Sequence, residues 1–488
     1  MPEFELKFQV PSGRVDAVAA AVRRGAVEEQ RLQARYFDTG EQALAAKRIA
    51  LRLRKEGRRW VQTAKAPGAH AFERLEHEVP LPTGAAPQLD LARHAGEPVG
   101  DCLREALGDD PAVLECYLET DITRLSRTVT AGGSSVEIAL DRGELRAHGR
   151  VQRVQEIEFE LKEGSAAALV ELAGRWCEKH GLWLDPLSKS DAGRRLAQGE
   201  TQPPAVRPEP PKLQQRTGTG FAGALLRAGL QQALGNAREF GAGAGSDEHV
   251  HQLRVGLRRV RTVLRELDAL GDLASVQEQV GPALDALFQV LGQHRDRATL
   301  VPALEREVLA AGGPPLAWRP ALPDLGAAVR AAPVQAAWLQ LLAAAHRLEQ
   351  APQEGAPPLA TTRRLVRKRL RKLHARVLQE GVRFETLDEP ARHSVRKRLK
   401  RLRYLAELSQ ALFPDRAVDS FVGELKALQD ALGLYQDEVV GGELMREHAA
   451  EEPAAWFAVG WLAGREPLLA KQCARACRRL KKVDVFWD

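Results

Sequence analysis

The spacing of apolar residues changes once along this chain of 488 residues, and the change divides it into two kinds of structure. Up to about residue 195, apolar and polar residues alternate in short stretches such as residues 3–10 and 156–162. A period of two places the polar side chains on one face of a β-strand, so these stretches predict strands. Helical patterns over residues 15–24 and 166–180 interrupt the strands, which predicts an α+β domain with an antiparallel sheet or barrel.

A proline-rich segment marks the change of period. Residues 200–213 contain five prolines and no apolar periodicity, which is typical of a stiff, extended linker. Beyond it the apolar residues follow a helical period, in stretches separated by glycine and proline loops. The sequence therefore predicts an α+β domain over residues 1–199, a linker over residues 200–216 and an all-α bundle over residues 217–488.

The helical half contains an internal repeat. The segments that begin at His251 and His393 both read H-x-x-R-x-x-L-[RK]-R-x-R. A repeat separated by about 140 residues suggests two similar helical subdomains.

Positive charge is concentrated in this half. The net charge of the chain is only +6, but residues 361–403 contain 16 Lys and Arg against 4 Asp and Glu. A local excess of 12 leaves about −6 for the rest of the chain. Such a patch attracts polyanions, among them nucleic acid, an anionic membrane or polyphosphate.

Other features indicate the compartment. The five cysteines include no C-x-x-C pair, which favours a reducing environment. Residues 1–5 carry acids where a secretory signal would need basic side chains. The longest nearly apolar stretch, residues 336–345, is well short of the roughly 20 residues that span a bilayer. We therefore expect a cytoplasmic protein without a membrane partner.

Several predicted strands in the first half carry nearly pure acidic or basic faces. A solvated outer face explains any one of them, but a solubilising surface normally mixes the two signs. If the sheet instead closes around a lumen, the acids can hold a hard divalent cation and the bases can hold phosphate. Periodicity alone leaves both interpretations open. The residues concerned are Glu3, Glu5 and Lys7, Arg52 and Arg54, Glu76 and Glu78, Glu137 and Asp141, and Glu156, Glu158 and Glu160.

A series of motifs over about 190 residues resembles the CYTH superfamily, which includes class IV adenylyl cyclases, thiamine triphosphatases and inorganic triphosphatases. The chain opens with Glu3-x-Glu5-x-Lys7, like the ExExK signature of that family. In order there follow Tyr36-Phe37-Asp38-Thr39, Leu51-Arg52-Leu53-Arg54, Gln62-Thr63-Ala64-Lys65, Arg74-x-Glu76-x-Glu78, Thr120-Asp121-x-x-Arg124, Glu137-x-x-x-Asp141-x-Gly143, Glu156-x-Glu158-x-Glu160 and Ser188-Lys189-Ser190.

This resemblance implies an eight-stranded antiparallel tunnel barrel that binds a linear triphosphate together with Mg²⁺ or Mn²⁺. It implies phosphate contacts for Lys7, Arg52, Arg54, Lys65, Arg124 and Lys189. It implies that Glu3, Glu5, Asp141, Glu156, Glu158 and Glu160 bind metal and position the attacking water, with Glu76, Glu78 and Glu137 as further tunnel acids. Spacing does not say which two of Glu156, Glu158 and Glu160 correspond to the metal-binding pair of the family.

The repeated helices carry a basic stripe opposite their apolar face. At about 100° per residue, the leucines of the first repeat fall on the side away from its histidine and arginines. Solvated helix faces would be the ordinary explanation, but like charges spaced by three or four residues destabilise a helix unless an anion neutralises them. The stripes consist of His251, Arg254, Arg258 and Arg261, then His393, Arg396, Lys397, Lys400 and Arg403, with Arg363, Arg367, Arg371 and His374 on a third helix.

These helices resemble the CHAD domain, the conserved-histidine α-helical domain. Further similarity lies in Leu291-Gly292-x-x-Arg295-Asp296 and in the motif from Leu425 to Asp437. The resemblance implies two four-helix bundles related by a pseudo-twofold axis, with a basic surface that binds inorganic polyphosphate.

Together the motifs predict a CYTH-CHAD protein that hydrolyses inorganic triphosphate to pyrophosphate and phosphate and that binds polyphosphate, with an association with polyphosphate granules. The main alternative is a non-catalytic polyphosphate-binding protein. Thiamine triphosphatase, class IV adenylyl cyclase and nucleic-acid binding by the basic helices are lesser alternatives. No specific nucleic-acid partner is expected, because Tyr404 is the only aromatic residue among the stripes.

Overall fold

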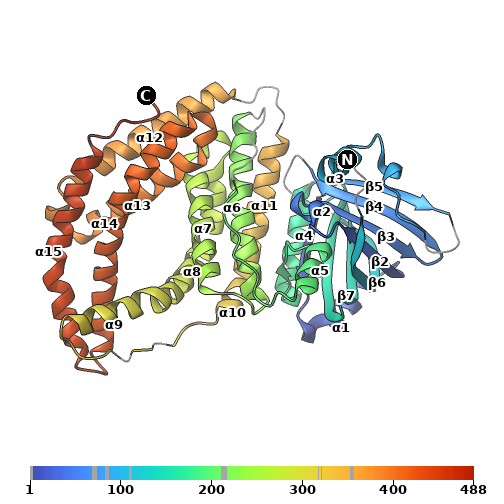
Figure 1. The fold of residues 1–488 in the computed structure, drawn as a ribbon, viewed down its shortest axis with the longest axis horizontal. Helices are drawn as coiled ribbons and strands as arrows, with labels where there is room; N and C mark the ends of the chain where they lie inside the picture. Colours follow the sequence, from blue (N-terminus) through green and yellow to red (C-terminus); the bar gives the residue numbers. More distant parts are fainter. Residues whose placement is uncertain are drawn as a thin grey trace. The chain divides into compact units, whose positions relative to one another are not determined.

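The computed structural model describes residues 4–68, 74–82, 87–108, 113–209, 217–316, 318–319, 321–351 and 357–488. Glu3 lies outside these residues. The chain forms two compact units (Figure 1). The first comprises Met1–Val206, Leu234–His249 and Gly326–His346, and the second comprises Arg207–Ala233, Val250–Leu325 and Arg347–Asp488.

An antiparallel sheet of nine strands forms the centre of the first unit, in the order β5-β4-β3-β2-β6-β7-β8-β1-β9. The expected antiparallel architecture is confirmed, but the eight-stranded count is not. The ninth strand is a two-residue segment that pairs with β1, and β5 and β9 form the two edges of the described sheet. The strands are β1 (Phe4–Gln9), β2 (Glu28–Asp38), β3 (Ala50–Glu56), β4 (Arg59–Pro67), β5 (Arg74–Leu81), β6 (Glu115–Ala131), β7 (Ser134–Ala147), β8 (Arg150–Glu163) and β9 (Trp183–Leu184).

One face of this sheet is apolar and covered by helices. The helices α1 (Val15–Val22) and α4 (Ala166–His180) contact strands β6 and β7, and α2 (Ala43–Ala46) and α3 (Pro98–Leu107) pack near β3 and β4. Because successive strand residues point to opposite faces, the buried side chains of Phe8, Ile157 and Phe159 lie on this side. The other face is left for the charged members of the alternation.

The helix α5 (Lys189–Gln198) packs against the apolar end of that second face. Ser188 caps the helix, with its side chain accepting a hydrogen bond from the Asp191 amide. Gly193 lies so close to Leu118 that a Cβ atom would come within 2.2 Å of the leucine side chain. Close packing of α5 therefore fixes its first residue, Lys189, beside the charged part of the face.

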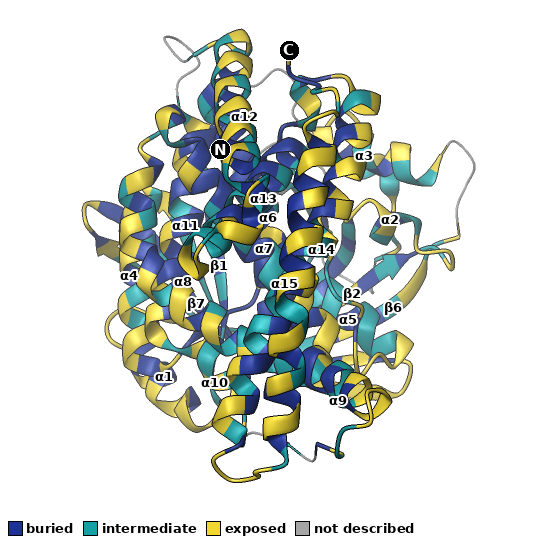
Figure 2. Ribbon diagram, turned by 90° about the vertical axis from the view of Figure 1, so that its left-hand side faces the viewer, coloured by how far each residue is buried: buried dark blue, intermediate teal, exposed yellow. Residues whose placement is uncertain are grey.

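The rest of the chain is helical, which confirms the expected all-α half. Pro390 lies in the first turn of α13, and the Asp388 side chain caps the helix by accepting from the Ala391 amide. Buried and exposed residues alternate around α15 at the helical period (Figure 2). The helices are α6 (Gly218–Gly241), α7 (Asp247–Glu266), α8 (Leu273–Arg295), α9 (Val301–Ala310), α10 (Leu325–Arg330), α11 (Ala332–Gln350), α12 (Leu359–Gly381), α13 (Glu389–Leu408), α14 (Asp415–His448) and α15 (Ala455–Leu480).

No described helix has the length and hydropathy needed to cross a bilayer.

Candidate functional site

The strand register places the predicted acids and bases of four strands on one face of the sheet. Arg124 on β6 pairs with Asp141 on β7, and Asp141 pairs with Glu156 on β8. Two residues further along β8, Glu158 pairs with Lys7 on β1. In the next row of polar residues across the strands, Glu160 pairs with Glu137 on one side and with Glu5 on the other. All these positions have the same parity, so their side chains leave the sheet on the same side.

The remaining strands continue this face. Tyr36 on β2 pairs with Arg52 on β3, while Glu78 on β5 pairs with Thr63. The Arg52 Nη1 atom donates to the Tyr36 hydroxyl at 3.3 Å, and Arg54 Nη2 donates to Glu78 Oε1 at 3.1 Å. Lys65 Nζ lies 2.7 Å from Glu76 Oε2. The alternation thus brings together side chains from strands that are distant in sequence.

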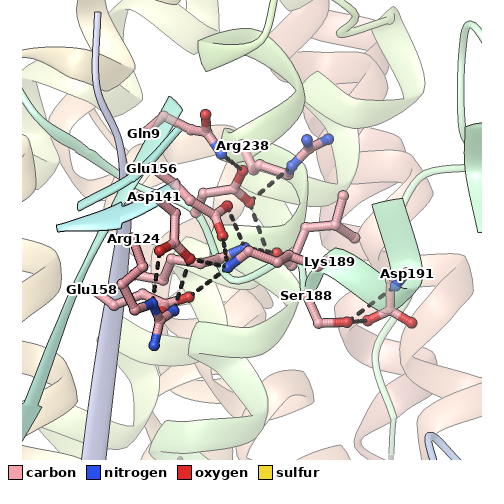
Figure 3. Close-up of polar contacts among 12 residues, drawn as sticks. Gln9, Arg124, Asp141, Glu156, Glu158, Ser188, Lys189, Asp191 and Arg238 are labelled. Atoms are coloured by element: carbon pink, nitrogen blue, oxygen red, sulfur yellow. Dashed lines mark hydrogen bonds and ion pairs between the residues drawn. The ribbon is translucent and has the colours of Figure 1, made fainter. Parts of the chain in front are cut away.

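Three carboxylates form the centre of the site (Figure 3). One oxygen from each of Asp141, Glu156 and Glu158 lies within 4.8 Å of the others. Lys189 Nζ is 2.7 Å from Asp141 Oδ2 and 2.9 Å from Glu158 Oε1, and it also contacts Glu156. Among the described residues this is the one cluster of three or more candidate metal ligands, and carboxylate oxygens suit a hard divalent cation.

Arg124 and Lys7 complete the charge balance around these acids. The Arg124 guanidinium forks onto Asp141, with Nε and Nη2 each donating at 2.7 Å, and it also contacts Glu158. Lys7 Nζ donates to Glu156 Oε2 at 3.1 Å and to the carbonyl oxygen of Leu187. Three cations therefore face three carboxylates in this small volume.

The opposite charges outweigh the burial of these groups. Burial alone lowers the pKa of Lys189, but Asp141, Glu156 and Glu158 raise that pKa well above its usual range. Burial would raise the pKa of Glu158, but Lys189 and Arg124 hold that pKa well below its usual range. Both groups are therefore charged at neutral pH.

Glu160 stands apart from the central three carboxylates. Its Oε1 atom accepts from Lys162 Nζ at 2.5 Å, and Lys162 also lies 3.9 Å from Glu137. The three glutamates therefore lie in two places: Glu156 and Glu158 lie beside Asp141, whereas Glu160 lies in the row with Glu5.

In the second unit, the two basic repeats converge. Arg254 and Arg258 on α7, Arg295 at the end of α8, and Arg396 and Lys400 on α13 form a group that we call the basic cluster. Burial, together with the charges of the four arginines, lowers the pKa of Lys400 to about 5. Burial and the charge of Arg258 lower the pKa values of Arg254 and Arg396 to about 10.

Few acids oppose the basic cluster. Arg295 Nη1 donates to Asp296 at 2.8 Å and Nη2 donates to Asp437 at 2.9 Å. The guanidinium groups of Arg254, Arg258 and Arg261 lie 4.3, 5.3 and 4.9 Å from the centroid of the Phe288 ring, whose face favours cations. The cluster is therefore held by an aromatic ring and two carboxylates against its own repulsion.

The other predicted residues of the stripes lie in different surroundings. His251 and Lys397 are exposed, and the ring of His393 lies 3.4 Å from the Gln436 side chain. Arg403 donates to Glu407 at 2.7 Å and to Gln429 at 2.6 Å, and Arg261 donates to Asp285 at 2.6 Å.

The basic arc expected along α12 is not continuous. Arg363 and Arg367 line a groove of about 460 Å³ beside Leu412, while Arg371 donates to Asp488 at 2.9 and 2.7 Å. His374 does not lie on an open basic surface, because the rings of Phe421 and Trp487 pack against it at centroid distances of 5.9 and 5.5 Å.

Comparison with known proteins agrees with these two arrangements. Residues 1–192 match the family model of the CYTH domain, and residues 224–446 match that of the CHAD domain. The chain carries a CYTH domain followed by a CHAD domain.

Two relatives illustrate the extent of the similarity. An uncharacterized protein of Mycobacterium tuberculosis is 29% identical over 537 aligned positions, which cover 99% of this chain and 96% of that protein. An inorganic triphosphatase of Haemophilus influenzae is 27% identical over 164 positions, covering 33% of this chain and 44% of that enzyme. A solved CHAD domain from Ricinus communis covers 58% of this chain and 97% of its own, at 25% identity and a TM-score of 0.43.

Two residues of the CYTH domain site were given no role from the sequence. Tyr36 belongs to a recognised motif, yet only the pairing of β2 with β3 shows that its hydroxyl contacts Arg52. Lys162 continues the alternation of Glu156, Glu158 and Glu160 by one step, so the period of two could have placed it on the same face.

Proposed function

We propose that the CYTH domain is a divalent-metal-dependent enzyme that hydrolyses inorganic triphosphate to pyrophosphate and phosphate. The observation that carries the proposal is the gathering of arginine and lysine side chains with three central carboxylates on one sheet face. Similarity of residues 1–192 to the CYTH domain, and of part of the chain to an inorganic triphosphatase, supports it.

The basic side chains match the chemistry of a linear chain of phosphates. Arginine presents a planar fork of N–H donors that fits phosphate oxygens, and lysine supplies a compact positive charge. Arg52, Arg54 and Lys65 lie at one part of the face, and Arg124, Lys7 and Lys189 lie at the other. Phosphate groups bound between them would be oriented and neutralised along their length.

The central carboxylates fit a metal ion. Asp141, Glu156 and Glu158 would hold Mg²⁺ or Mn²⁺ through oxygens that already lie within 4.8 Å of one another. A divalent ion there supplies positive charge to the phosphate oxygens during transfer. The same carboxylates already stabilise one cation, the ammonium of Lys189.

Hydrolysis then needs mainly positioning and charge neutralisation. A water oxygen forms a bond to a terminal phosphorus while the bond from that phosphorus to the bridging oxygen breaks, and the bridging oxygen leaves with pyrophosphate. Arg52, Arg54 and Lys65 stabilise the phosphoryl oxygens on which charge gathers. A carboxylate of the site takes the proton of the water.

We further propose that the CHAD domain binds inorganic polyphosphate at the basic cluster. A half-buried group of four arginines and one lysine, opposed by Asp296 and Asp437, lacks the negative charge that a polyanion brings. Binding would remove the repulsion that depresses the pKa of Lys400. The CHAD domain would then hold the enzyme at long phosphate chains.

Phosphate release from inorganic triphosphate, with and without Mg²⁺ or Mn²⁺, tests the enzymatic proposal. ATP, thiamine triphosphate and longer polyphosphate serve as competing substrates. Glu156→Gln should lose metal-dependent turnover, whereas the matched change Glu144→Gln, in an exposed pair with Arg146 on the same strand, should not. Triphosphate binding without metal-dependent turnover in the native chain would leave only a binding function.

Competition between polyphosphate and nucleic acid for the native chain tests the second proposal. The salt concentration is held fixed, because both polyanions bind more weakly as salt rises. Arg258→Gln should weaken polyphosphate binding, whereas Arg306→Gln, an exposed arginine on α9, should not. Preference of the native chain for DNA or RNA over polyphosphate of equal charge would contradict it.

A further inference from the structure

The segment that carries Lys189 into the candidate site is held by side chains from outside the sheet. It runs from β9 to the start of α5, over residues 183–189. On its inner side it is bound to β1, because the Asp185 amide donates to the Lys7 carbonyl at 2.9 Å and Lys7 Nζ donates to the Leu187 carbonyl. The segment therefore connects two proposed phosphate-binding lysines through its backbone.

Asp185 organises this segment. Its side chain is buried, with about 1% of the residue exposed. The carboxylate accepts from Gln9 Nε2 at 2.8 Å, from the Leu187 amide at 2.9 Å and from Arg238 Nε at 2.9 Å (Figure 3 shows Arg238 beside Gln9). Only Arg238 brings a positive charge among these donors, so it is the group that compensates the buried carboxylate.

Arg238 lies on α6, within the region that matches the CHAD domain and within the first compact unit. Its Nη1 atom donates to Glu239 Oε1 at 2.9 Å, and Glu239 also accepts from Arg195 of α5 at 2.7 Å. Burial opposes the charge of Arg238, but Asp185 and Glu239 raise its pKa above the usual range. Arg238 and Glu239 of α6 thus bind two neighbouring parts of the CYTH domain: Arg238 binds residue 185 before α5, and Glu239 binds residue 195 within α5.

Two other contacts from the helical part of the first unit reach the same segment. The Leu184 amide donates to Gln335 Oε1 of α11 at 2.8 Å. Gly241 at the end of α6 lies against the Trp183 ring, where a Cβ atom would come within 2.9 Å of the ring. Helices outside the CYTH match therefore touch residues 183, 184 and 185 in turn.

We propose that Arg238 is a positioning residue of the triphosphate site, which acts through Asp185 to hold the segment that places Lys189 among the central carboxylates. This inference rests on the proposed function for its catalytic consequence only. Without Arg238, the Asp185 carboxylate remains buried with two neutral donors. The segment must then shift to hydrate it, and it carries Lys189 with it.

The test compares Arg238→Gln, Arg238→Lys and Arg227→Gln in the full chain. Arg227 lies on the same helix and pairs at 3.0 Å with the buried Glu349, so its change also removes an arginine from a buried carboxylate but does not touch residues 183–189. Amide hydrogen exchange of residues 183–190 is measured beside triphosphate kinetics. For Arg238→Gln we expect exchange at Leu187 at least about tenfold faster, and kcat/KM for triphosphate lower by about 10-fold to 100-fold.

Arg238→Lys keeps the charge and should recover part of both effects, whereas Arg227→Gln should leave the exchange of this segment unchanged. Unaltered exchange of residues 183–190 in Arg238→Gln would overturn the inference whether or not the chain hydrolyses triphosphate. Faster exchange with undiminished turnover would overturn it as well. Faster exchange in a chain whose native form shows no turnover would support the positioning role of Arg238 and count against the enzymatic proposal alone.

Discussion

Lys189 Nζ lies 2.7 Å from Asp141 Oδ2, which joins the first residue of α5 to the middle of β7. The ammonium occupies the centre of three carboxylates that otherwise repel one another. The stability of the CYTH domain and its affinity for a metal should therefore be linked.

Lys189→Met should destabilise the protein in the absence of divalent ions by about 3 kcal/mol, because the three clustered carboxylates then face only the two charges of Arg124 and Lys7. Mn²⁺ should restore more stability to this variant than to the native chain, since the ion replaces the lost charge. Thermal unfolding with and without Mn²⁺ measures both effects. Lys179→Met, at an exposed position of α4, is the control. Equal stabilisation of native and Lys189→Met chains by Mn²⁺ would contradict this prediction.

The stability of the native chain should fall as pH falls below the ordinary glutamate range. Lys189 and Arg124 keep the pKa of Glu158 well below its usual range against the effect of burial. A depressed folded-state pKa contributes stability that is present above the unfolded value and is lost as pH decreases through the folded value. Urea unfolding at pH 7, 5 and 4 should show this loss. Replacing Glu158 by Gln should make the curve flatter, and an equally steep curve in that variant would assign the loss to other acids.

Polyphosphate binding should strengthen as pH falls from 8 to 6. Lys400 in the free protein has a pKa of about 5, and phosphate groups would raise it by neutralising the arginines that face it. One proton is then taken up on binding, which corresponds to at most about tenfold in affinity per pH unit. His393 on the same helix also has a lowered pKa and contributes in the same direction.

Calorimetric titration with long polyphosphate, in buffers of different ionisation enthalpy, counts the protons. Lys400→Arg keeps a permanent charge, so it should bind with a reduced pH dependence. Lys400→Met should stabilise the free protein by about 1 to 3 kcal/mol at pH 7, because the unfolded chain no longer binds a proton that the folded chain excludes. A proton count that does not differ between the native chain and Lys400→Arg would rule out Lys400 as the acceptor.

Two glycine substitutions should have opposite effects on stability. At Gly143 a Cβ atom would lie 2.0 Å from the Asp121 carbonyl oxygen, so Gly143→Ala should separate β6 from β7 and cost about 2 to 4 kcal/mol. Gly423 lies exposed inside α14 with nothing within 4 Å of such a Cβ, so Gly423→Ala should add about 0.5 to 1 kcal/mol. Urea unfolding of the two variants measures the difference, and two shifts of the same sign would refute the explanation.

The alternation of charged residues predicted much of the first site because a period of two is a geometric property of strands. It placed Glu156 and Glu158 on a common face, and the pairing of β7 with β8 then brings Asp141 to them. Pairing itself joins residues far apart in sequence, so the sequence could not separate Glu160 from the other two. The contact between Asp185 and Arg238 spans 53 residues and the proline-rich segment, and no periodic signal points to it.

For the basic stripes of the helices, the sequence predicted the face of each residue but not its surroundings. Helical angles separated Lys400 correctly from the leucine face, which suggested an exposed side chain. Arg254 and Arg258 of the first repeat instead lie close to it, because the two stripes meet within one unit. A helical wheel describes one helix, whereas burial of a polar face depends on its neighbour. The surroundings of His374 also come from other helices and the C-terminal segment, since the rings of Phe421 and Trp487 pack against it.

The common parity of the charged residues also limits how this chain can change in length. Deleting one residue near the middle of β8 would exchange the roles of its two sets of side chains, so that Ile157 and Phe159 would take the places of the carboxylates. Such a change removes the ligands and exposes apolar surface in the same step. The sheet can therefore accept many substitutions between the site positions, but insertions and deletions are confined to its loops.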